Sequence, residues 1–361
     1  MRKLKVGLIG LGKVAESHLA GYREVDCIEV VSGAEVSRER LRQMTDKWGL
    51  RGYLDPEEMI ARESLDLVCI LTPPSTHRRL TELAAARGLH VLCEKPLALS
   101  LEDGRAMISA AERAGVKLYY GSSYRCLPAV IKARQMIAAG EVGHVALMIE
   151  TFIGGGGPEK WIDLGPHHYP LDGPGGGGMG LVDHGIHLAD IIPWLAGSEI
   201  RAVFGRGNYS GRKPGPEYLT MVLENGAVGQ LLYHEATYPA VMPGEGIFSL
   251  GASWDVLGNI VPGGDWDHQP QNIQVYGDQG ALRIFHYANQ LFFFHHGGVK
   301  QVQVLDRPNP GHFGLQIETF AACITKDEPP PVTGNDGLKA LQVILAAYRS
   351  AENKEIVSLE T

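Results

Sequence analysis

The first 121 residues alternate between short apolar runs and segments with a helical spacing of apolar side chains. The apolar runs, typical of buried strands, occur at 4–9, 28–34, 65–72, 89–94 and 116–121. The helical segments lie between them, at 15–25, 37–49, 55–61, 75–88 and 100–115. This alternation predicts a parallel, doubly wound sheet of the α/β class, which binds ligands at the carboxyl ends of its strands.

A glycine-rich turn joins the first predicted strand to the first predicted helix. Gly10, Gly12 and Ala15 form a GxGxxA pattern, in which Gly10 permits a tight turn and Gly12 lets a pyrophosphate approach the backbone. Lys13 and Val14 complete the pattern where the helix N-terminus supplies free N–H groups and partial positive charge. A glycine turn without a ligand is the alternative, but its position predicts a dinucleotide-binding Rossmann domain, which we assign to residues 1–123.

An acidic residue, Glu35, follows the second predicted strand, roughly 20 residues after the glycine turn, as this kind of site requires. Its carboxylate can accept hydrogen bonds from a ribose diol and would repel a 2′-phosphate. Arg38 and Arg40 lie nearby and would weaken that preference if they met the phosphate. We therefore expect NAD as the cofactor, with NADP as the alternative.

Two further strand ends suit the same site. In the stretch TPPSTH the prolines direct the chain out over the sheet edge, where a cofactor would lie. In the stretch EKP, Lys95 is expected in the crevice where nicotinamide meets substrate, able to polarise a carbonyl or share an alcohol proton. The alternatives are a stiff strand-to-helix connection and a strand-end salt bridge. The residues assigned here to the cofactor site are Thr72, Pro73, His77, Glu94, Lys95 and Pro96.

The segment 180–197 has the pattern of a helix, and it places Asp183 and His187 four residues apart. Residues at that spacing share one helix face, so both side chains can point into one cleft. A metal site would need a further ligand, and no HExxH or comparable pattern supports one. The remaining alternatives are a proton-transfer pair and a polar helix start with a packed histidine; Asp190 is left as structural.

From residue 124 onward the pattern changes. A helix at 127–140 precedes several strand-like runs with hairpin turns at 224–229 and 277–282. This predicts an α+β domain over 124–361, in which helices cover one face of a large, mostly antiparallel open sheet.

Two long Gly/Pro-rich segments, 154–178 and 238–270, interrupt this second domain, and loops of that length are usually functional or disordered. Their aromatic and polar residues, Trp161 among them, suit a sugar site, with lids or subunit contacts as the alternative. Lys160 and Arg125 are candidates for meeting an anionic group on the substrate.

Composition bounds the possible partners. The net charge is −8 with Lys and Arg dispersed, which argues against nucleic acid and anionic membranes as partners. No apolar stretch approaches the length of a membrane span. Five scattered cysteines without a CxxC pair argue against a zinc ribbon or disulfide framework and favour reduced thiols in a cytoplasmic protein.

Taken in order, these motifs resemble those of the Gfo/Idh/MocA oxidoreductases, which include glucose–fructose oxidoreductase and inositol dehydrogenases. The resemblance begins with GxGxxA, TPPSTH and EKP, and it covers almost the whole chain. It continues through an R-x-x-P…G-x-(I/V)-G pattern at Arg125, Pro128, Gly140 and Gly143, and through segments 175–192, 275–284 and 320–359.

The resemblance implies a site, because members carry a D-x-x-x-H dyad at the place of Asp183 and His187. With Lys95 this dyad surrounds the reacting carbon. By this resemblance His187 is the general base that takes the hydroxyl proton while hydride leaves to nicotinamide. Asp183 would orient substrate and keep His187 basic, and Lys95 would polarise the same oxygen. The family's open sheet builds a dimer interface, so a homodimer or homotetramer is expected.

The expected function is an NAD-dependent dehydrogenase that oxidises a secondary hydroxyl of a sugar, sugar derivative or cyclic polyol. One alternative is a redox-neutral glycosidase that retains NAD, oxidises a glycoside transiently and eliminates the aglycone. Another is a non-catalytic sugar- or NAD-sensing protein, against which the presence of Lys95, Asp183 and His187 argues. The residues expected to bind substrate are Arg125, Lys160, Trp161, Asp183 and His187.

Overall fold

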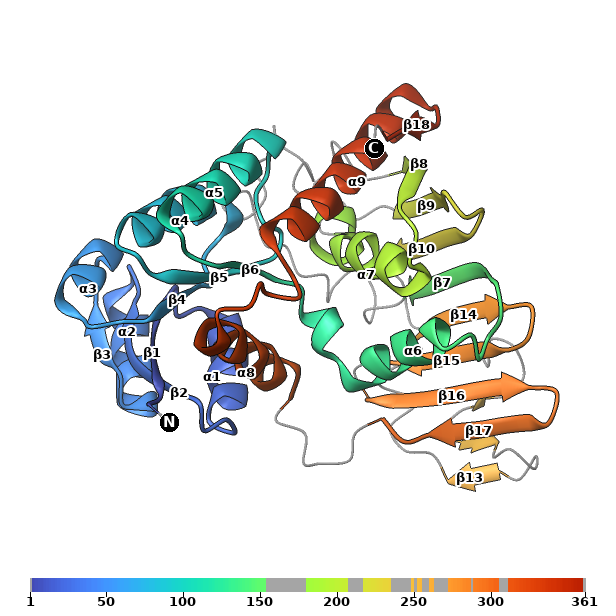
Figure 1. Cartoon of the computed structure of the whole chain (residues 1–361), viewed down its shortest axis with the longest axis horizontal. Helices are drawn as coiled ribbons and strands as arrows, with labels where there is room; N and C mark the ends of the chain where they lie inside the picture. The colour runs from blue at the N-terminus through green and yellow to red at the C-terminus, as the bar shows by residue number, and fades with distance from the viewer. Residues whose placement is uncertain are drawn as a thin grey trace. The chain divides into compact units, whose positions relative to one another are not determined.

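The computed structural model divides the chain into two compact units (Figure 1). The first unit contains Met1–Cys126 and Pro308–Gln342, and the second contains Leu127–Arg307 and Val343–Thr361. The residues that the structure describes are 2–153, 180–206, 217–234, 248–249, 252–254, 260–262, 272–286, 288–304 and 311–359.

The first unit is built on a parallel sheet with strand order β3-β2-β1-β4-β5-β6. Its strands are β1 (Leu4–Ile9), β2 (Ile28–Ala34), β3 (Arg51–Tyr53), β4 (Leu67–Ile70), β5 (His90–Glu94) and β6 (Leu118–Gly121). The order reverses between β1 and β4, which is where doubly wound sheets bind dinucleotides. The predicted parallel, doubly wound sheet is confirmed.

Helices cover both faces of this sheet. They are α1 (Lys13–Tyr22), α2 (Arg38–Trp48), α3 (Pro56–Arg62), α4 (His77–Ala86), α5 (Leu101–Ala114), α8 (Gly311–Lys326) and the start of α9 (Gly334–Asn353). Figure 1 shows α4 and α5 on one face and α1 and α8 on the other. Both faces are covered, so β4 is apolar throughout and its Leu67 and Ile70 are fully buried.

Helix α8, which lies far along the chain from α1, packs against that helix through glycine. A Cβ on Gly21 of α1 would lie 2.6 Å from the backbone nitrogen of Gly314 in α8. The two helix backbones therefore approach more closely than any larger residue at position 21 would allow.

The second unit is built on a larger sheet with strand order β17-β16-β15-β14-β7-β10-β9-β8-β18. Only β7 and β10 pair in parallel among the strand pairs described for it, so the predicted mostly antiparallel sheet is confirmed. Its strands are β7 (Val145–Ile153), β8 (Ile200–Arg206), β9 (Glu217–Leu223), β10 (Val228–His234), β14 (Ile273–Gly277), β15 (Ala281–Phe285), β16 (Gln290–His295), β17 (Gly298–Val302) and β18 (Val357–Ser358).

A smaller sheet, with order β11-β12-β13, belongs to the same unit. Its strands are β11 (Phe248–Ser249), β12 (Ala252–Trp254) and β13 (Ile260–Pro262). The helices of the unit are α6 (Pro128–Ala138), α7 (Ile186–Ala196) and the later part of α9.

Helices cover one face of the nine-stranded sheet. A Cβ on Gly229 of β10 would meet Ile192 of α7, and one on Gly205 of β8 would meet Ala347 of α9. Along β9, buried Leu219, Met221 and Leu223 alternate with half-buried residues, because successive side chains of a strand point to opposite faces. Within the described part of the chain, no helix is both long and apolar enough to cross a membrane.

Candidate active site

The turn after β1 has the backbone that the glycine pattern predicts. Gly10 has φ +89°, and a Cβ there would lie 2.9 Å from the carbonyl oxygen of Leu71, so only glycine fits without strain. Gly12 precedes α1 and provides no side-chain cap, and a Cβ on it would meet nothing within 4 Å. Because Gly12 has no side chain, the first backbone amides of α1 have no side-chain cap from that position. A ligand can therefore approach the Gly12 backbone.

Glu35, just beyond β2, lies against this turn. One of its carboxylate oxygens accepts a hydrogen bond from the Leu11 amide at 3.0 Å. Arg40 of α2 donates to the carbonyl oxygens of Leu11 at 2.7 Å and Gly12 at 3.1 Å, while Arg38 is exposed. The turn between β1 and α1 is therefore held by an acidic and a basic side chain.

Arg40 is also bound to an acidic partner. Hydrogen bonds from Lys47 and Arg40 lower the pKa of Glu16 to about 2, so Glu16 remains ionised at neutral pH. Lys13 beside it is exposed and Val14 is half-buried. The Arg40 guanidinium is thus shared between the backbone of the turn and a permanent carboxylate.

The turns after β4 and β5 are joined by a buried histidine. One ring nitrogen of His77 lies 2.8 Å from the Thr72 carbonyl oxygen, and the other lies 3.1 Å from that of Pro96. Burial lowers the pKa of His77, although these carbonyls favour the charged form. Pro73 is half-buried at the start of the connection. His77 therefore fixes the Thr72 turn relative to the Lys95–Pro96 peptide, which is cis.

Glu94 and Lys95 differ in burial. Glu94 is buried, and its carboxylate accepts hydrogen bonds from the Lys95 amide at 3.0 Å and lies 2.9 Å from Nε2 of His18. Lys95 itself is half-buried. His18 was not expected from the sequence, although its position three residues after Ala15 places it on the helix face that packs on the sheet.

The strand order brings these predicted residues to one edge of the first unit. β2, β1, β4 and β5 are consecutive neighbours in a parallel sheet, so the turns with Glu35, Gly10, Thr72 and Lys95 follow adjacent carboxyl ends. Ligands of doubly wound sheets bind at this edge.

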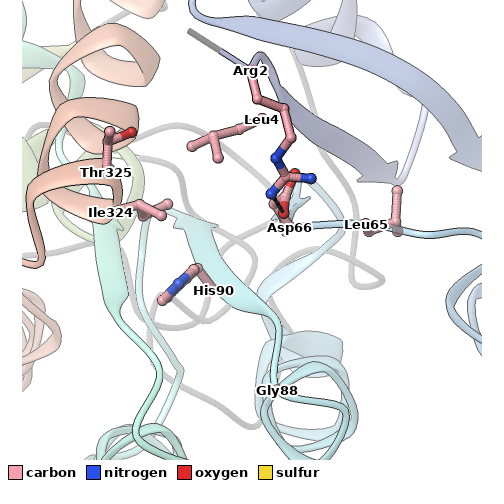
Figure 2. Close-up of a pocket in the computed structure, with 8 residues that line it drawn as sticks. All are labelled: Arg2, Leu4, Leu65, Asp66, Gly88, His90, Ile324 and Thr325. Atoms are coloured by element: carbon pink, nitrogen blue, oxygen red, sulfur yellow. Dashed lines mark hydrogen bonds and ion pairs between the residues drawn. The ribbon is translucent and has the colours of Figure 1, made fainter.

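A pocket of about 510 Å³ lies at the opposite edge of the same sheet (Figure 2). Leu4 and His90, at the amino ends of β1 and β5, line it, and Ile324 belongs to α8. In Figure 2, Arg2 reaches to Asp66, with which it forms an ion pair at 2.6 Å. This pocket is therefore separate from the edge that carries the predicted cofactor residues.

In the second unit, Asp183 lies in the turn that precedes α7, and His187 is the second residue of that helix. The turn before it, Gly180–Gly185, is π-helical rather than α-helical, a feature often found at functional sites. Two side chains that are distant in sequence accept hydrogen bonds from the first backbone amides of this turn. Glu217 accepts from the Leu181 amide at 2.7 Å, and the Tyr348 hydroxyl accepts from the Val182 amide at 3.2 Å. These acceptors stabilise a turn that carries half-buried Asp183 and leads into buried His187.

A Cβ at Gly180 would lie 1.6 Å from a carboxylate oxygen of Glu217. Only glycine therefore lets Glu217 approach the π-helical turn closely enough to accept the Leu181 amide.

A buried acidic residue lies near the dyad. Glu150 of β7 is fully buried and lies 2.9 Å from Nε2 of His184 and 3.5 Å from Nε2 of His286. Burial would raise the pKa of Glu150, but the charges of these histidines hold it below its ordinary value. The His184 and His187 rings are 6.2 Å apart. Glu150 was not expected, because it follows an apolar strand pattern and is separated from His184 by 34 residues.

The other predicted residues have varied surroundings. Asp190 is 2% exposed, and Arg125 in the first unit is half-buried and donates a hydrogen bond to Asp336 at 3.1 Å. Lys160 and Trp161 lie outside the described residues. No group of three His, Cys, Asp or Glu side chains suited to a metal ion occurs in the described part of the chain.

Relatives with assigned activities match the whole chain. D-apiose dehydrogenase of Paraburkholderia graminis is 27% identical, with 100% of this chain and 91% of that protein covered. Myo-inositol 2-dehydrogenase of Thermotoga maritima is 27% identical, with 99% of each covered. The crystal structure of aldose-aldose oxidoreductase from Caulobacter crescentus complexed with glycerol superposes with a TM-score of 0.80 at 24% identity, covering 99% of this chain and 100% of that one.

Two family descriptions also match in sequence order. Residues 4–122 match the oxidoreductase family's NAD-binding Rossmann fold, and residues 134–359 match its C-terminal alpha/beta domain. The second match alone covers more than half of the chain, and the resemblance drawn from the motifs is confirmed. The chain therefore belongs to the Gfo/Idh/MocA oxidoreductase family and has that family's NAD-binding Rossmann domain.

Proposed function

We propose that this protein is an NAD-dependent dehydrogenase that oxidises a secondary hydroxyl of a sugar, sugar derivative or cyclic polyol. The observation that carries the proposal is the position of the Glu35 carboxylate against the glycine turn after β1. It combines with family membership and with relatives named for D-apiose and myo-inositol, a sugar and a cyclic polyol.

The residues at this edge fit a dinucleotide. The uncapped amides of α1 and the open backbone at Gly12 suit a pyrophosphate, which helix N-termini bind well. Gly10, Lys13 and Val14 shape the rest of this cradle. Glu35 suits the ribose hydroxyls and disfavours a 2′-phosphate, since two anions would then be adjacent. Arg40 does not reverse this preference because Glu16 and the turn carbonyls already engage it.

Thr72, Pro73, His77, Glu94 and Pro96 complete the proposed cofactor site, His77 and Glu94 by holding the turns in place. A bound nicotinamide would supply the hydride acceptor. This assignment makes the sheet edge the cofactor surface of the first unit.

Lys95, Asp183 and His187 are proposed to act on one substrate hydroxyl. His187 would accept the hydroxyl proton, a task suited to an imidazole at neutral pH. Asp183 would orient substrate and favour the protonated imidazole, and the Lys95 ammonium would donate a hydrogen bond to the reacting oxygen. Arg125, Lys160 and Trp161 remain proposed substrate contacts.

The test is an assay of the purified protein with NAD and a panel of aldoses, inositols and aryl glycosides. Growth of absorbance at 340 nm with an aldose or inositol supports the dehydrogenase. Release of aglycone without net absorbance growth would instead identify the redox-neutral glycosidase. Sugar binding by calorimetry without turnover in either assay would identify the sensor.

We further propose that the nine-stranded sheet pairs two copies of the chain. Leu231 of β10 faces Gly185 on the helix side, so the next residue, Leu232, faces the other way, and it is 38% exposed. Leu232 lies opposite Tyr218 in the sheet, and the Tyr218 ring packs against that of Phe204, which is 37% exposed. Adjacent exposed apolar side chains on one sheet face suit a self-complementary interface.

Light scattering after size exclusion tests this assembly. The wild type is expected at the mass of a dimer or tetramer, and Leu232→Glu at a lower mass, because it places charges opposite each other in a two-fold interface. Arg201→Glu, on the exposed part of β8, is the charge control. A monomeric wild type would refute the assembly.

A further inference from the structure

We propose that His18 and Glu94 are positioning residues for Lys95, so that a buried pair inside the Rossmann unit sets the position and charge environment of the catalytic ammonium. This inference rests on the proposed role of Lys95. Of these two residues, His18 lies in a helix and Glu94 at the end of a strand. The sequence motifs assign no catalytic task to His18.

The contact chain is continuous. The hydroxyl of Tyr22 lies 2.9 Å from Nδ1 of His18, and Nε2 of His18 lies 2.9 Å from one carboxylate oxygen of Glu94. The other oxygen of Glu94 accepts the Lys95 amide at 3.0 Å. A carboxylate only accepts hydrogen bonds, so Nε2 of His18 must carry the proton between them. The chain therefore runs from α1 to the backbone of Lys95.

The pair is buried deeply enough to be rigid. The side chain of His18 is 0% exposed and that of Glu94 is 8% exposed. The His18 ring also packs against Phe313 of α8, with ring centroids 3.9 Å apart. Breaking one partner of such a pair leaves a buried carboxylate without its donor, which is costly. The interaction between His18 and Glu94 therefore opposes movement of the Lys95 peptide.

The environment of the pair keeps Glu94 ionised. Burial would raise the pKa of Glu94, but the hydrogen bond and charge of His18, together with the charge of Lys95, hold it below its ordinary value. The other titratable groups that face this chain are Cys69 of β4, Cys93 of β5, His77 of α4, Tyr119 of β6 and His312 of α8. An ionised Glu94 favours the ammonium form of Lys95, because opposite charges nearby stabilise each other.

A small displacement of a catalytic group is enough to slow a reaction strongly. We therefore expect His18→Ala to lower kcat by about tenfold to a hundredfold while the Kd for NAD changes by less than about threefold. His18→Gln retains a side-chain N–H donor for Glu94 and should recover most of the lost kcat. The matched control is His90→Gln, at the opposite end of β5 in the pocket of Figure 2.

A double-substitution cycle separates positioning from a general structural role. If His18 acts through Glu94, His18→Ala should lower kcat little further in a Glu94→Ala background. Multiplicative losses in the double variant would overturn the proposal. So would a normal kcat for His18→Ala with only a lower melting temperature.

A measurement on the protein without substrate keeps the test independent of the proposed function. Lysines are reductively methylated with ¹³C-formaldehyde, and the Lys95 signal is assigned by its loss in Lys95→Arg. Glu94→Gln should move the titration of this signal to lower pH because it removes the neighbouring negative charge. His18→Ala should also change the pH at which the Lys95 signal titrates, whereas His90→Gln should leave that pH unchanged.

An unchanged Lys95 titration in both Glu94→Gln and His18→Ala would refute the positioning role, whatever the assay shows. Conversely, displaced titrations in a protein that turns over no polyol would sustain the positioning role and reject the proposed dehydrogenase. The two failures are therefore distinguishable.

Discussion

The Glu35 carboxylate accepts a hydrogen bond from the Leu11 amide at 3.0 Å, so the acidic residue after β2 is held against the glycine turn after β1. A second hydrogen bond, from the Ser37 amide to the other oxygen, fixes its orientation. The carboxylate is thus part of the turn's own structure. The negative charge that would discriminate between NAD and NADP is therefore already in position before any ligand binds.

We expect Glu35→Gln to weaken discrimination against NADP. The amide oxygen can still accept the Leu11 amide, but the negative charge that repels a 2′-phosphate is gone. The kcat/KM ratio of NAD to NADP should fall by about tenfold or more, in line with the ~1.5–3 kcal/mol of a charged hydrogen bond. Steady-state kinetics with both cofactors measure this ratio.

Glu39→Gln is the matched control, because Glu39 is an exposed glutamate in the first turn of α2 with Gln43 as its partner. It removes the same charge without touching the turn. An unchanged cofactor ratio in Glu35→Gln, or an equal change in the control, would contradict the assignment of Glu35.

Alanine at the two glycines of the turn should separate stability from binding. Gly10→Ala forces a Cβ into a positive φ and toward the Leu71 carbonyl, so it should lower the melting temperature by about 4 °C or more. Gly12→Ala meets no atom within 4 Å and has φ −65°, so it should leave the melting temperature unchanged. It should nevertheless weaken NAD binding, because the new methyl group occupies the proposed approach of the pyrophosphate.

Thermal melting and fluorescence titration with NAD distinguish these outcomes. Tight NAD binding by Gly12→Ala would place the pyrophosphate elsewhere. An unaltered melting temperature in Gly10→Ala would mean that the turn relaxes to accept a side chain.

Much of the first unit was predictable, because the evidence for it is local in sequence. The apolar runs of β1, β4 and β5 specify strands, and the rule that ligands bind at their carboxyl ends gathers Gly10, Thr72 and Lys95 without any knowledge of packing. Family resemblance added the dyad of Asp183 and His187. Their catalytic roles stay predictions.

The interior contacts could not be predicted, because they depend on how distant elements pack. His18 and Glu94 are 76 residues apart, and nothing in either motif states that the rotation of α1 turns one toward the other. The π-helical turn before α7 depends on acceptors supplied by Glu217 and Tyr348, which lie far along the chain. Helical periodicity predicted a helix there, but not the geometry of its first turn.

The proposed base is tested by His187→Ala. If the imidazole takes the hydroxyl proton, kcat should fall by about two to four orders of magnitude, the range of general acid–base catalysis. Asp183→Asn should lower kcat less and move the acidic limb of the kcat profile to lower pH, because the anion that favours protonated imidazole is lost. Stopped assays with the best substrate of the polyol panel measure both.

His144→Ala, at an exposed histidine before β7, controls for loss of an imidazole as such. A near-normal kcat in His187→Ala, with retained substrate binding, would remove the base assignment. It would leave the cofactor site at the sheet edge unaffected.

Stability should fall with acid through partly buried His312 at the start of α8. Burial, with a smaller effect from the charge of His18, lowers the pKa of His312 from 6.5 to about 4. Below pH 6.5 the unfolded chain therefore binds a proton that the folded chain refuses until about pH 4. The free energy of unfolding should decline across this window by up to about 1.4 kcal/mol per pH unit for this group, and no further below it.

Urea denaturation of wild type and His312→Asn between pH 7 and 4 measures this contribution. The variant should lose less stability on acidification, because its amide does not titrate, while His144→Asn at the exposed site should follow the wild type. His286 of the second unit has a pKa lowered to about 4, chiefly by burial, and contributes in the same direction, so some acid sensitivity should persist in His312→Asn. If the free energy of unfolding falls equally with acid in His312→Asn and wild type, the pKa of His312 in the folded protein has its ordinary value.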